Sequence, residues 1–459
     1  MVMAKLPLTT LILAAGEGTR MRSSKPKVMH ELAGKPLILH VIKAAEAAQS
    51  ARLGIVIGPD HDDVRALIEA RAPKAQISVQ KNRLGTAHAV MQAEELLKDA
   101  NGHVLIIYGD TPLLRAETLL LMSQKLAAGA DVVVGAFKTD NPTGYGRIIQ
   151  KGDKVIAIRE GKDASAAEKS IKLVNGGVMG FSAQHAHALI KGIGNKNKAK
   201  EYYLTEAVSL ASAKGLQVDT VLIPEEDTLG VNTRAQLAAV EQIMQQRLRK
   251  KLLENGVTLV APETVFIARD AVVEEDVTIE PYVFIGRGVK IEKGAQILSF
   301  SHLEGVTVGK GARIGPFARL RPGTVIGDHA HVGNFVEINR STLGDHADVN
   351  HLTYLGDTDV GQGTNVGAGT ITCNFDGGMK FKTKIGSDVF VGSNTTLVAP
   401  LNIGNEAMIA AGSVVTRDVQ AGNLVFGRVK EQISLPERGA QKIRANKKAR
   451  AARKAKEKS

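Results

Sequence analysis

A glycine-containing loop near the start of the chain is the first stretch whose residue types could do chemistry. The sequence LAAGEGTRM, from Leu13 to Met21, follows the apolar run LTTLI and precedes SSKPKVMH. Glycines let backbone amides approach a phosphate closely, and Arg20 and Lys27 add fixed positive charge. The loop has neither the GK[ST] ending of a Walker loop nor the third glycine of a dinucleotide fingerprint. The residues therefore indicate phosphate handling by another kind of loop.

Aspartate and histidine could also carry chemistry, but the residue type alone does not decide whether a given one does. Asp110 ends the mostly apolar run HVLIIYGD, shortly before a proline, where an aspartate is as often only a turn or capping residue. Histidine is suited to take a proton near neutral pH, and the chain has 12. Several, including His329, His331 and His346, lie in predicted turns, where we expect them to be solvated. The single cysteine, Cys373, excludes an internal disulfide and is typical of a reducing compartment.

The elements that must position these residues change character at about residue 232. Before it, short apolar runs alternate with helical patterns, which predicts a mainly parallel sheet with helices on both faces and ligands at the carboxyl ends of the strands. The expected strands are 8–14, 53–58, 77–80, 103–110 and 131–137, and the expected helices are 36–48 and 87–99. Residues 233–256 follow with helical spacing and end at Gly256, which predicts a linker helix.

The second half repeats every six residues. Aliphatic residues recur at this spacing in five phased runs with 24 positions: 267–303, 308–338, 343–355, 360–366 and 385–415. Neither a helix nor an alternating strand has this period, whereas a parallel β-helix of hexapeptide repeats does. Glycines such as Gly286, Gly309 and Gly386 follow the aliphatic position, where a tight turn needs backbone freedom. The period does not fix the hand, and the usual rule for crossovers favours the right hand.

Composition limits the partners. The chain has 459 residues, 44% hydrophobic and 4% aromatic, with a net charge of +12. Ten Lys or Arg and one Glu lie between Arg438 and Ser459, so most of this charge is in the tail. We expect 429–459 to be a basic, disordered tail, and we expect neither nucleic-acid binding nor membrane insertion. The apolar start is explained better by a core strand than by a signal peptide, so we expect a cytoplasmic protein.

The order of motifs along the chain resembles one enzyme family. LAAGEGTRM and PKVMH are followed by LGTAHA, YGDTPL, PTGYGR, EYYLTE and GVN, as in the sugar nucleotidyltransferases. With GPFARLRPG, NHLTYLGD and GAGTITCNFDG in the second half, residues 8–428 resemble the bacterial bifunctional N-acetylglucosamine-1-phosphate uridyltransferases and glucosamine-1-phosphate acetyltransferases. The resemblance implies a Rossmann-like uridyltransferase domain (1–232), the linker helix (233–256), a left-handed parallel β-helix acetyltransferase domain (257–428) and the tail.

The resemblance also implies the first site. Uridyl transfer from UTP to N-acetylglucosamine 1-phosphate needs Mg²⁺, held by Asp110 and Asn232, while Arg20 and Lys27 contact phosphates. The residues implied to take the uridine are Leu13, Ala14, Ala15, Gly16, Gln80, Gly85 and Thr86. Those implied to line the sugar side are Tyr108, Gly109, Gly146, Glu160, Asn175 and Asn232.

The second implied reaction is acetyl transfer from acetyl-CoA to glucosamine 1-phosphate, which yields the acceptor of the first. His351 in NHLTYLGD matches the general base of the family. Arg321 and Tyr354 are implied to bind the sugar phosphate and Asn365 to contact the substrate. In this family the groove for acetyl-CoA lies between neighbouring β-helices, which implies a homotrimer. The product, UDP-N-acetylglucosamine, is implied to serve cell-wall synthesis. The residues implied to line this acetyl-CoA groove are Ala368, Asn374, Phe375, Ser393, Ala411 and Arg428.

The chain departs from the family pattern at one phosphate-facing position. Where a lysine is usual, VEINRS places Asn339, and a neutral amide cannot replace that charge unless the neighbouring Arg340 reaches round. Smaller departures are NGG at 175–177, Glu206 for Asp and Phe375 for Tyr. Two alternatives stay open: an enzyme with only uridyltransferase activity, or another sugar phosphate, whose β-helix is a trimerising scaffold, and a polyanion-binding protein that works through its tail.

Overall fold

The computed structural model describes residues 6–427, which form two compact units. The first unit contains the chain up to Asn255 together with Pro262–Ala271 and Ile285–Arg287, and the second contains Gly256–Ala261, Val272–Phe284 and the chain from Gly288 onward. Arg428 and the predicted tail at 429–459 lie outside the described residues. No helix within 6–427 combines the length and the apolar character that a membrane span requires.

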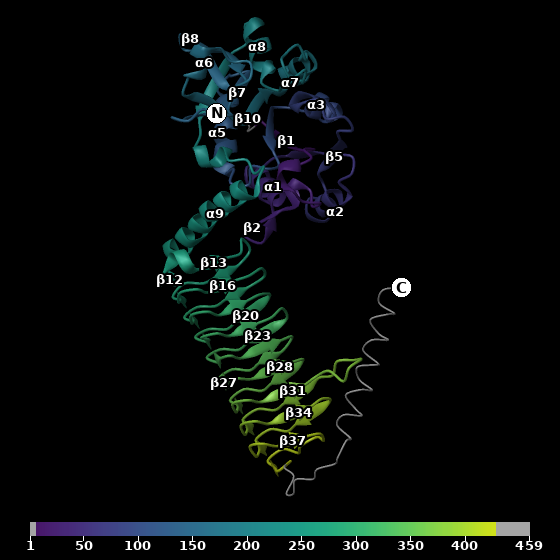
Figure 1. The fold of residues 1–459 in the computed structure, drawn as a ribbon, viewed down its shortest axis with the longest axis vertical. Helices are drawn as coiled ribbons and strands as arrows, with labels where there is room; N and C mark the ends of the chain where they lie inside the picture. The colour runs from purple at the N-terminus through teal and green to yellow at the C-terminus, as the bar shows by residue number, and fades with distance from the viewer. Residues whose placement is uncertain (1–5, 428–459) are drawn as a thin grey trace. The chain divides into compact units, whose positions relative to one another are not determined.

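The first unit is built on a mixed sheet whose order is β11-β7-β10-β6-β1-β4-β5 (Figure 1). β1 pairs in parallel with β4 and β6, whereas β10 runs antiparallel to β6 and β7. The predicted parallel core is therefore confirmed, and β10 with the hairpin β8–β9 was not anticipated. The strands are β1 (Leu8–Ala14), β4 (Arg52–Ile57), β5 (Gln76–Val79), β6 (His103–Tyr108), β7 (Val132–Lys138), β8 (Arg147–Lys151), β9 (Lys154–Arg159), β10 (Leu173–Ser182) and β11 (Val218–Leu222).

Helices cover both faces of this sheet, as expected. Leu11 and Leu13 of β1 belong to one buried cluster, and Ile12 and Ala14 to the other, because successive side chains of a strand point to opposite faces. The first cluster includes side chains of α3 (Thr86–Met91), α4 (Glu94–Lys98), α7 (Ala183–Lys191) and α8 (Glu206–Ala213). The second includes side chains of α1 (Leu37–Ala47), α2 (Asp62–Arg71) and α5 (Ala116–Ala127).

The prediction of one continuous helix over 87–99 was wrong, because the structure divides this segment into α3 and α4. Ala93, the residue before α4, has φ −103° and ψ 30°, which lies outside the helical region. The short elements of this unit are η1 (Thr19–Met21), η2 (Lys27–Met29), β2 (Glu31–Leu32), β3 (Lys35–Pro36), α6 (Ala166–Lys169), η3 (Glu225–Thr228), η4 (Pro262–Thr264) and β13 (Phe266–Ile267).

The predicted linker helix is α9 (Arg234–Glu254). Thr233 and Gln236 form a capping box at its start, in which each side chain binds the backbone of the other residue. Gly256, just beyond its end, has φ +83°, the left-handed conformation that glycine adopts without steric strain.

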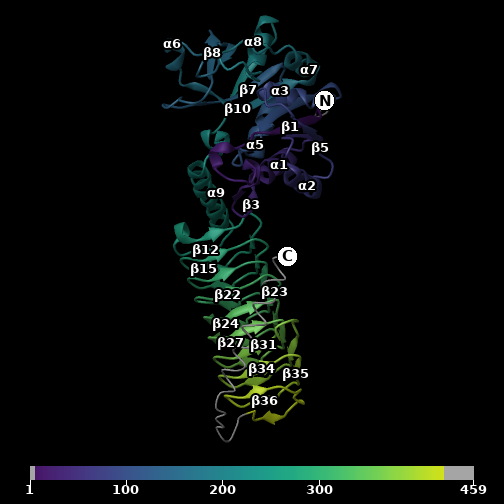
Figure 2. The same cartoon turned by 45° about the vertical axis from the view of Figure 1, so that its right-hand side comes forward.

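The second unit is a parallel β-helix of three sheets (Figures 1 and 2). One sheet contains β12 (Thr258–Leu259), β15 (Thr278–Ile279), β18 (Gln296–Ile297), β21 (Arg313–Ile314), β24 (His331–Asn334), β27 (Asp348–His351), β30 (Asn365–Val366), β33 (Phe390–Val391), β36 (Met408–Ile409) and β38 (Leu424–Val425). A second contains β16 (Phe284–Ile285), β19 (His302–Leu303), β22 (Arg319–Leu320), β25 (Glu337–Asn339), β28 (Tyr354–Gly356), β31 (Ile371–Cys373), β34 (Thr396–Val398) and β37 (Val414–Val415). The third contains β14 (Val272–Val273), β17 (Lys290–Ile291), β20 (Val306–Val308), β23 (Thr324–Ile326), β26 (Thr342–Leu343), β29 (Thr358–Val360), β32 (Thr383–Ile385) and β35 (Leu401–Ile403).

All 24 aliphatic positions of the six-residue series are buried, so the predicted inward column is confirmed. Each coil contributes one aliphatic side chain to each sheet, and parallel pairing places it over the equivalent residue of the previous coil. Ile314, for example, pairs with Val332, which pairs with Val349. After β31 a loop extends away from the stacked coils before β32 begins (Figure 1).

Candidate active sites

The glycine loop after β1 lies against Lys27. Gly18 has φ +68°, and a Cβ atom added there would come within 2.6 Å of Lys27 Cβ. A glycine is therefore required for this close approach, and for a backbone conformation that other residues rarely adopt. The loop and the basic segment after it pack together, as the predicted phosphate-handling role requires.

Lys27 lies at the centre of a polar cluster drawn from three distant parts of the chain. Its Nζ forms an ion pair with Asp110 and donates a hydrogen bond of 3.0 Å to Asn232 Oδ1. Arg20 Nη2 donates to the same Asn232 oxygen over 3.1 Å. Asp110 follows the carboxyl end of β6, and its carbonyl accepts from the amide of Val231 at 2.9 Å, which fixes the two chain segments side by side.

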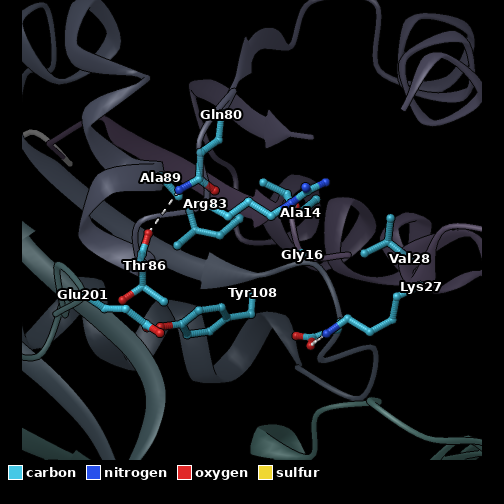
Figure 3. A pocket seen from close by; sticks show the side chains of 14 residues that line it. Ala14, Gly16, Lys27, Val28, Gln80, Arg83, Thr86, Ala89, Tyr108 and Glu201 are labelled. Atoms are coloured by element: carbon cyan, nitrogen blue, oxygen red, sulfur yellow. Dashed lines mark hydrogen bonds and ion pairs between the residues drawn. The ribbon is translucent and has the colours of Figure 1, made fainter. Parts of the chain in front are cut away.

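A cavity of about 280 Å³ opens beside the glycine loop (Figure 3). Every residue predicted to take the uridine lines it, and so do Lys27, Tyr108 and Asp110. Gln80 is buried, and its Nε2 donates to the carbonyl of Gly85 at 3.2 Å. Gly85 has φ +118°, and a Cβ there would lie 2.5 Å from the carbonyl oxygen of Tyr202. The predicted residues lining this cavity are Leu13, Ala14, Ala15, Gly16, Gln80, Gly85 and Thr86.

A second cavity of about 600 Å³ shares Thr86, Tyr108 and Asp110 with the first. It is lined by residues predicted for the sugar side, for the metal and, in the case of Arg20, for phosphate contact: Arg20, Gly146, Glu160, Asn175 and Asn232. Gly109 lines neither cavity. Its amide instead donates to Leu13 O at 2.9 Å, so it joins the ends of β6 and β1. The cluster around Lys27 therefore stands where the cavity lined by the predicted uridine residues meets the cavity lined by the predicted sugar residues.

The structure adds residues that the motifs did not single out. Arg83 lines the first cavity, donates from Nε to Ala15 O at 2.7 Å and from Nη1 to Glu17 at 2.8 Å, and so holds the glycine loop. Glu201 lines both cavities, and Thr205 Oγ1 in the second donates to Glu160 at 2.9 Å. Arg83 immediately precedes LGTAHA, and Glu201 opens EYYLTE, so proximity to a motif was the available signal.

The phenol of Tyr108 stays protonated at the junction of the cavities. Burial raises its pKa, and the negative charges of Glu160 and Asp110 raise it further, while a hydrogen bond with Thr86 acts in the opposite direction. Tyr108 therefore presents a neutral hydroxyl. Gly177, with φ +83°, packs against the ring, where a Cβ would lie 3.2 Å from Cε2.

The donor set of the cluster fits a magnesium ion that is held partly by substrate. The Lys27 ammonium is a cation already in contact with oxygens of both Asp110 and Asn232. A carboxylate and an amide oxygen are hard donors of the kind Mg²⁺ prefers, and it commonly takes its other ligands from phosphates and water. Within residues 6–427 no cluster of three or more His, Cys, Asp or Glu is placed to hold a metal.

In the β-helix, His351 lies in a vertical column of predicted residues. It pairs with Asn334 in the coil before, and the register Val349–Val366–Val391–Ile409 places Ala368, Ser393 and Ala411 at the same corner of the following coils. His351 is exposed, and its Nδ1 lies 3.0 Å from Asn334 Oδ1. Because an amide oxygen only accepts, Nδ1 is the donor in this contact, and in the neutral ring the lone pair is then on Nε2.

The residues predicted for the sugar phosphate lie on the adjacent sheet. Tyr354 pairs with Glu337 of β25, whose carboxylate accepts from Arg321 Nη1 at 2.9 Å. Asn339 is buried and pairs with Gly356. A Cβ on Gly356 would come within 2.5 Å of Tyr354 Oη and 2.6 Å of Asn374 Nδ2, so this glycine lets the two side chains converge.

Arg340 is engaged elsewhere. Its guanidinium forms two parallel hydrogen bonds with Asp357, of 2.7 and 2.8 Å, and Asn374 donates to the same carboxylate at 2.6 Å. The hydrogen bonds from Arg340 lower the pKa of Asp357. The charge of Arg340 is therefore already paired with Asp357 and does not stand in for the lysine that is usual at position 339.

The remaining predicted residues occupy separate places. Asn365 begins β30, and Phe375 is exposed in the extending loop, bridged to Lys380. Arg428 lies beyond the described residues, and neither of the two cavities described above is lined by a residue predicted for acetyl transfer.

Comparison with known proteins agrees with both units. Residues 10–171 match the family described as MobA-like NTP transferase domain, and residues 305–340 and 382–417 match the bacterial transferase hexapeptide family. The chain is 46% identical to Bifunctional protein GlmU of Bartonella quintana, covering 92% of this chain and 94% of that protein. It is 49% identical to Bifunctional protein GlmU of Brucella anthropi, covering 92% and 93%, and 48% identical to that of a Bradyrhizobium species, covering 91% and 94%.

The chain belongs to the GlmU family. It is a bifunctional transferase, with a nucleotidyltransferase built on a Rossmann-like sheet and a hexapeptide-repeat acyltransferase. The β-helix of this family is left-handed, as the motifs implied, against the general preference of crossovers for the right hand.

Proposed function

We propose that the β-helix transfers acetyl from acetyl-CoA to glucosamine 1-phosphate, and that the nucleotidyltransferase unit then transfers uridylyl from UTP to N-acetylglucosamine 1-phosphate. The observation that carries the proposal is the cluster of Lys27, Asp110 and Asn232 at the junction of two cavities. One cavity suits a nucleoside triphosphate and the other a sugar phosphate, so the reacting groups meet at the cluster.

In the proposed uridyl transfer, a phosphate oxygen of the sugar phosphate bonds to the α-phosphorus of UTP while the bond to the β-phosphate breaks and pyrophosphate leaves. Little covalent work falls to the protein, so alignment and charge neutralisation supply most of the catalysis. Lys27 and Arg20 would leave Asn232 to bind phosphate oxygens. Mg²⁺, held by Asp110 and Asn232, would neutralise the charge that develops on the leaving pyrophosphate.

The neutral hydroxyl of Tyr108 and the carboxylate of Glu160 line the sugar side of this site. Thr205 orients Glu160 through its hydrogen bond of 2.9 Å. A hydroxyl donor and a carboxylate acceptor suit the hydroxyl and amide groups of an acetylated amino sugar. We assign them to orientation of the acceptor, with Gly146 and Asn175 forming the adjacent backbone wall.

In the proposed acetyl transfer, Nε2 of His351 takes a proton from the sugar ammonium, and the free amine attacks the thioester carbonyl. The carbon–sulfur bond then breaks, and CoA leaves as the thiol after it gains a proton. The hydrogen bond with Asn334 holds the ring in the tautomer whose Nε2 can accept. Arg321, Tyr354 and Asn365 would hold the sugar phosphate.

We propose that Ala368, Ser393 and Ala411 form the floor of the acetyl-CoA groove, since small side chains in one column leave space along the corner. Asn374, Phe375 and Arg428 would complete it. Because His351 is exposed in the single chain, a neighbouring copy would supply the opposite wall of the groove, in keeping with the homotrimer that the resemblance implies. The two soluble substrates, UTP and acetyl-CoA, support a cytoplasmic location.

Two assays on the purified full chain test the proposal. Pyrophosphate release from UTP, Mg²⁺ and N-acetylglucosamine 1-phosphate reports the first activity, and thiol release from acetyl-CoA with glucosamine 1-phosphate reports the second. We expect both activities. Thiol release that is absent at millimolar acceptor, with pyrophosphate release intact, would instead support the uridyltransferase-only alternative, which the neutral Asn339 and the Arg340–Asp357 pair favour.

A further inference from the structure

A third cavity of about 470 Å³ lies in the first unit and shares no lining residue with the two cavities of the active site. It opens between α1, the loop that follows β6 and helix α9. We call it the α1–α9 cavity. Its wall is partly apolar, from side chains such as Leu114 and Met244, so a ligand there would meet both apolar and charged groups.

The α1–α9 cavity is strongly cationic. Five basic residues line it against one acidic residue, Glu117. Two of the five are matched by carboxylates. Arg115 and Arg247 both bind the buried Asp227, at 2.8 and 3.3 Å, and Arg247 also binds Glu226 at 2.7 Å. The other three have no carboxylate within salt-bridge distance among residues 6–427: these are Lys43, Lys251 and Arg269.

Arg269 is the cation of this cavity whose surroundings would favour an anion most. Its side chain is partly buried, and the contact of its guanidinium within the described chain is a donation to Met244 Sδ at 3.4 Å. Burial and the nearby positive charge of Arg247 lower the pKa of Arg269. A guanidinium desolvated beside a like charge is destabilised, and a bound anion would relieve both effects.

The cavity is connected to the active site through two short segments. Arg247 Nη1 donates to the carbonyl of Leu113 at 2.7 Å, three residues after Asp110. Arg247 and Arg115 also bind Asp227, five residues before Asn232. Cations of the α1–α9 cavity therefore bind both chain segments that carry the proposed metal ligands, at Leu113 in one segment and at Asp227 in the other.

We propose that the α1–α9 cavity binds a phosphate monoester, with the phosphate on Arg269, next to Arg247, and the organic part against the apolar wall. Guanidinium groups bind phosphate in a planar, two-pronged geometry, which favours this anion over a diffuse charge. Through Leu113 and Asp227, the bound ester stabilises the segments that end in Asp110 and Asn232. The site is independent of the substrates assigned above.

Equilibrium dialysis of phenyl phosphate against the full chain tests this inference. Arg20→Ala with Lys27→Ala is used as the background, because it removes the phosphate contacts proposed for the active site. In that background we expect one binding site per chain, with affinity at least about tenfold weaker after Arg269→Gln, since a hydrogen bond to a charged group contributes about 1.5–3 kcal/mol. Lys43→Gln, at an exposed residue of α1, is expected to weaken binding less.

The matched control is Lys250→Gln, which removes a neighbouring charge of α9 that pairs with Glu254 outside the cavity. We expect it to leave the affinity unchanged. Equal affinity in the background, Arg269→Gln and Lys43→Gln proteins would overturn the inference. So would an equal loss in Lys250→Gln, or no binding in the background protein. Because the readout is binding, it is independent of either transfer activity and therefore of the proposed function.

Discussion

The two units assemble their candidate sites in opposite ways. In the nucleotidyltransferase unit, Lys27 meets Asp110 and Asn232 across 83 and 205 positions of sequence. In the β-helix, His351 meets Asn334 across 17 positions, which is one turn of the coil. The first site depends on the whole tertiary fold, whereas the second depends on the register of adjacent coils. Damage to one is therefore expected to leave the other intact.

The substitution His351→Ala is expected to have the largest effect on this comparison. Loss of the proposed base should lower thiol release from acetyl-CoA by about 10²- to 10⁴-fold, the usual contribution of a general base. Pyrophosphate release should stay near the value of the unaltered protein. His346→Ala, at an exposed histidine in the preceding turn, serves as the control and should change neither rate. Equal loss of thiol release in both variants would refute the assignment.

Asp110→Asn tests the opposite side of the comparison. It keeps the shape of the side chain but removes the charge that faces Lys27 and the proposed magnesium, so pyrophosphate release should fall by about 10²- to 10³-fold. Acetyl transfer should be unaffected. Asp99→Asn, which removes an exposed partner of Arg52, is the control. Retention of uridyl transfer in the folded Asp110→Asn protein would contradict the proposed metal site.

The contrast between the units also explains what the sequence could predict. The six-residue period identifies all 24 buried aliphatic positions, because in a β-helix each position repeats the environment of the one below it. The first unit has no such repetition. Its strand β10, which separates β6 from β7, and the division between α3 and α4 are decided by tertiary packing, and neither follows from local pattern.

The same distinction holds for the sites. Family motifs identified Asp110, Asn232 and the nucleotide-cavity residues, and the structure brings these together. Arg83 was missed because its role, holding the glycine loop through Ala15, arises from a contact across 68 positions. By its position in the sequence Arg340 is a candidate substitute charge for Asn339, but it pairs with Asp357 because of the register between coils, which the sequence pattern does not give.

The acid stability of the first unit is expected to depend on His40. This side chain is 4% exposed, its Nε2 lies 2.9 Å from Leu32 O, and burial, with the charge of Arg269, lowers its pKa to about 4. The unfolded chain gains a proton below about pH 6.5, whereas the folded chain does so only near pH 4. The contribution of His40 to the free energy of unfolding should therefore be largest above pH 6.5. It should fall by about 3 kcal/mol as the pH is lowered from about 6.5 to about 4.

Denaturation by guanidinium chloride at pH 7.5 and 4.5, followed by circular dichroism, measures this fall. In His40→Gln, which keeps an amide donor for Leu32 O, the loss of stability on acidification should be smaller by about 3 kcal/mol. His346→Gln, at an exposed histidine of the β-helix, should behave as the unaltered chain does. An unchanged pH dependence in His40→Gln would show that its titration does not govern acid stability.

The smallest expected change concerns the acceptor of acetyl transfer. Asn339→Lys restores a positive charge facing the proposed phosphate position, while Arg340 remains bound to Asp357. We expect KM for glucosamine 1-phosphate to fall by about tenfold, consistent with one charge-assisted hydrogen bond, with kcat little changed. The control is Asn402→Lys, which adds the same charge in a distant coil. Asn334 is not used for this purpose because its side chain contacts His351. A KM that does not change would show that position 339 does not face the phosphate.

A mixing experiment tests the independence of the two sites most directly. Glucosamine 1-phosphate, acetyl-CoA, UTP and Mg²⁺ are supplied to the Asp110→Asn protein, to the His351→Ala protein, or to both together, and UDP-N-acetylglucosamine is measured. The account predicts almost no product from either variant alone and sustained production from the mixture, because one variant releases the acetylated sugar phosphate and the other consumes it. Failure of the mixture, when each variant retains its own half-reaction, would contradict the account.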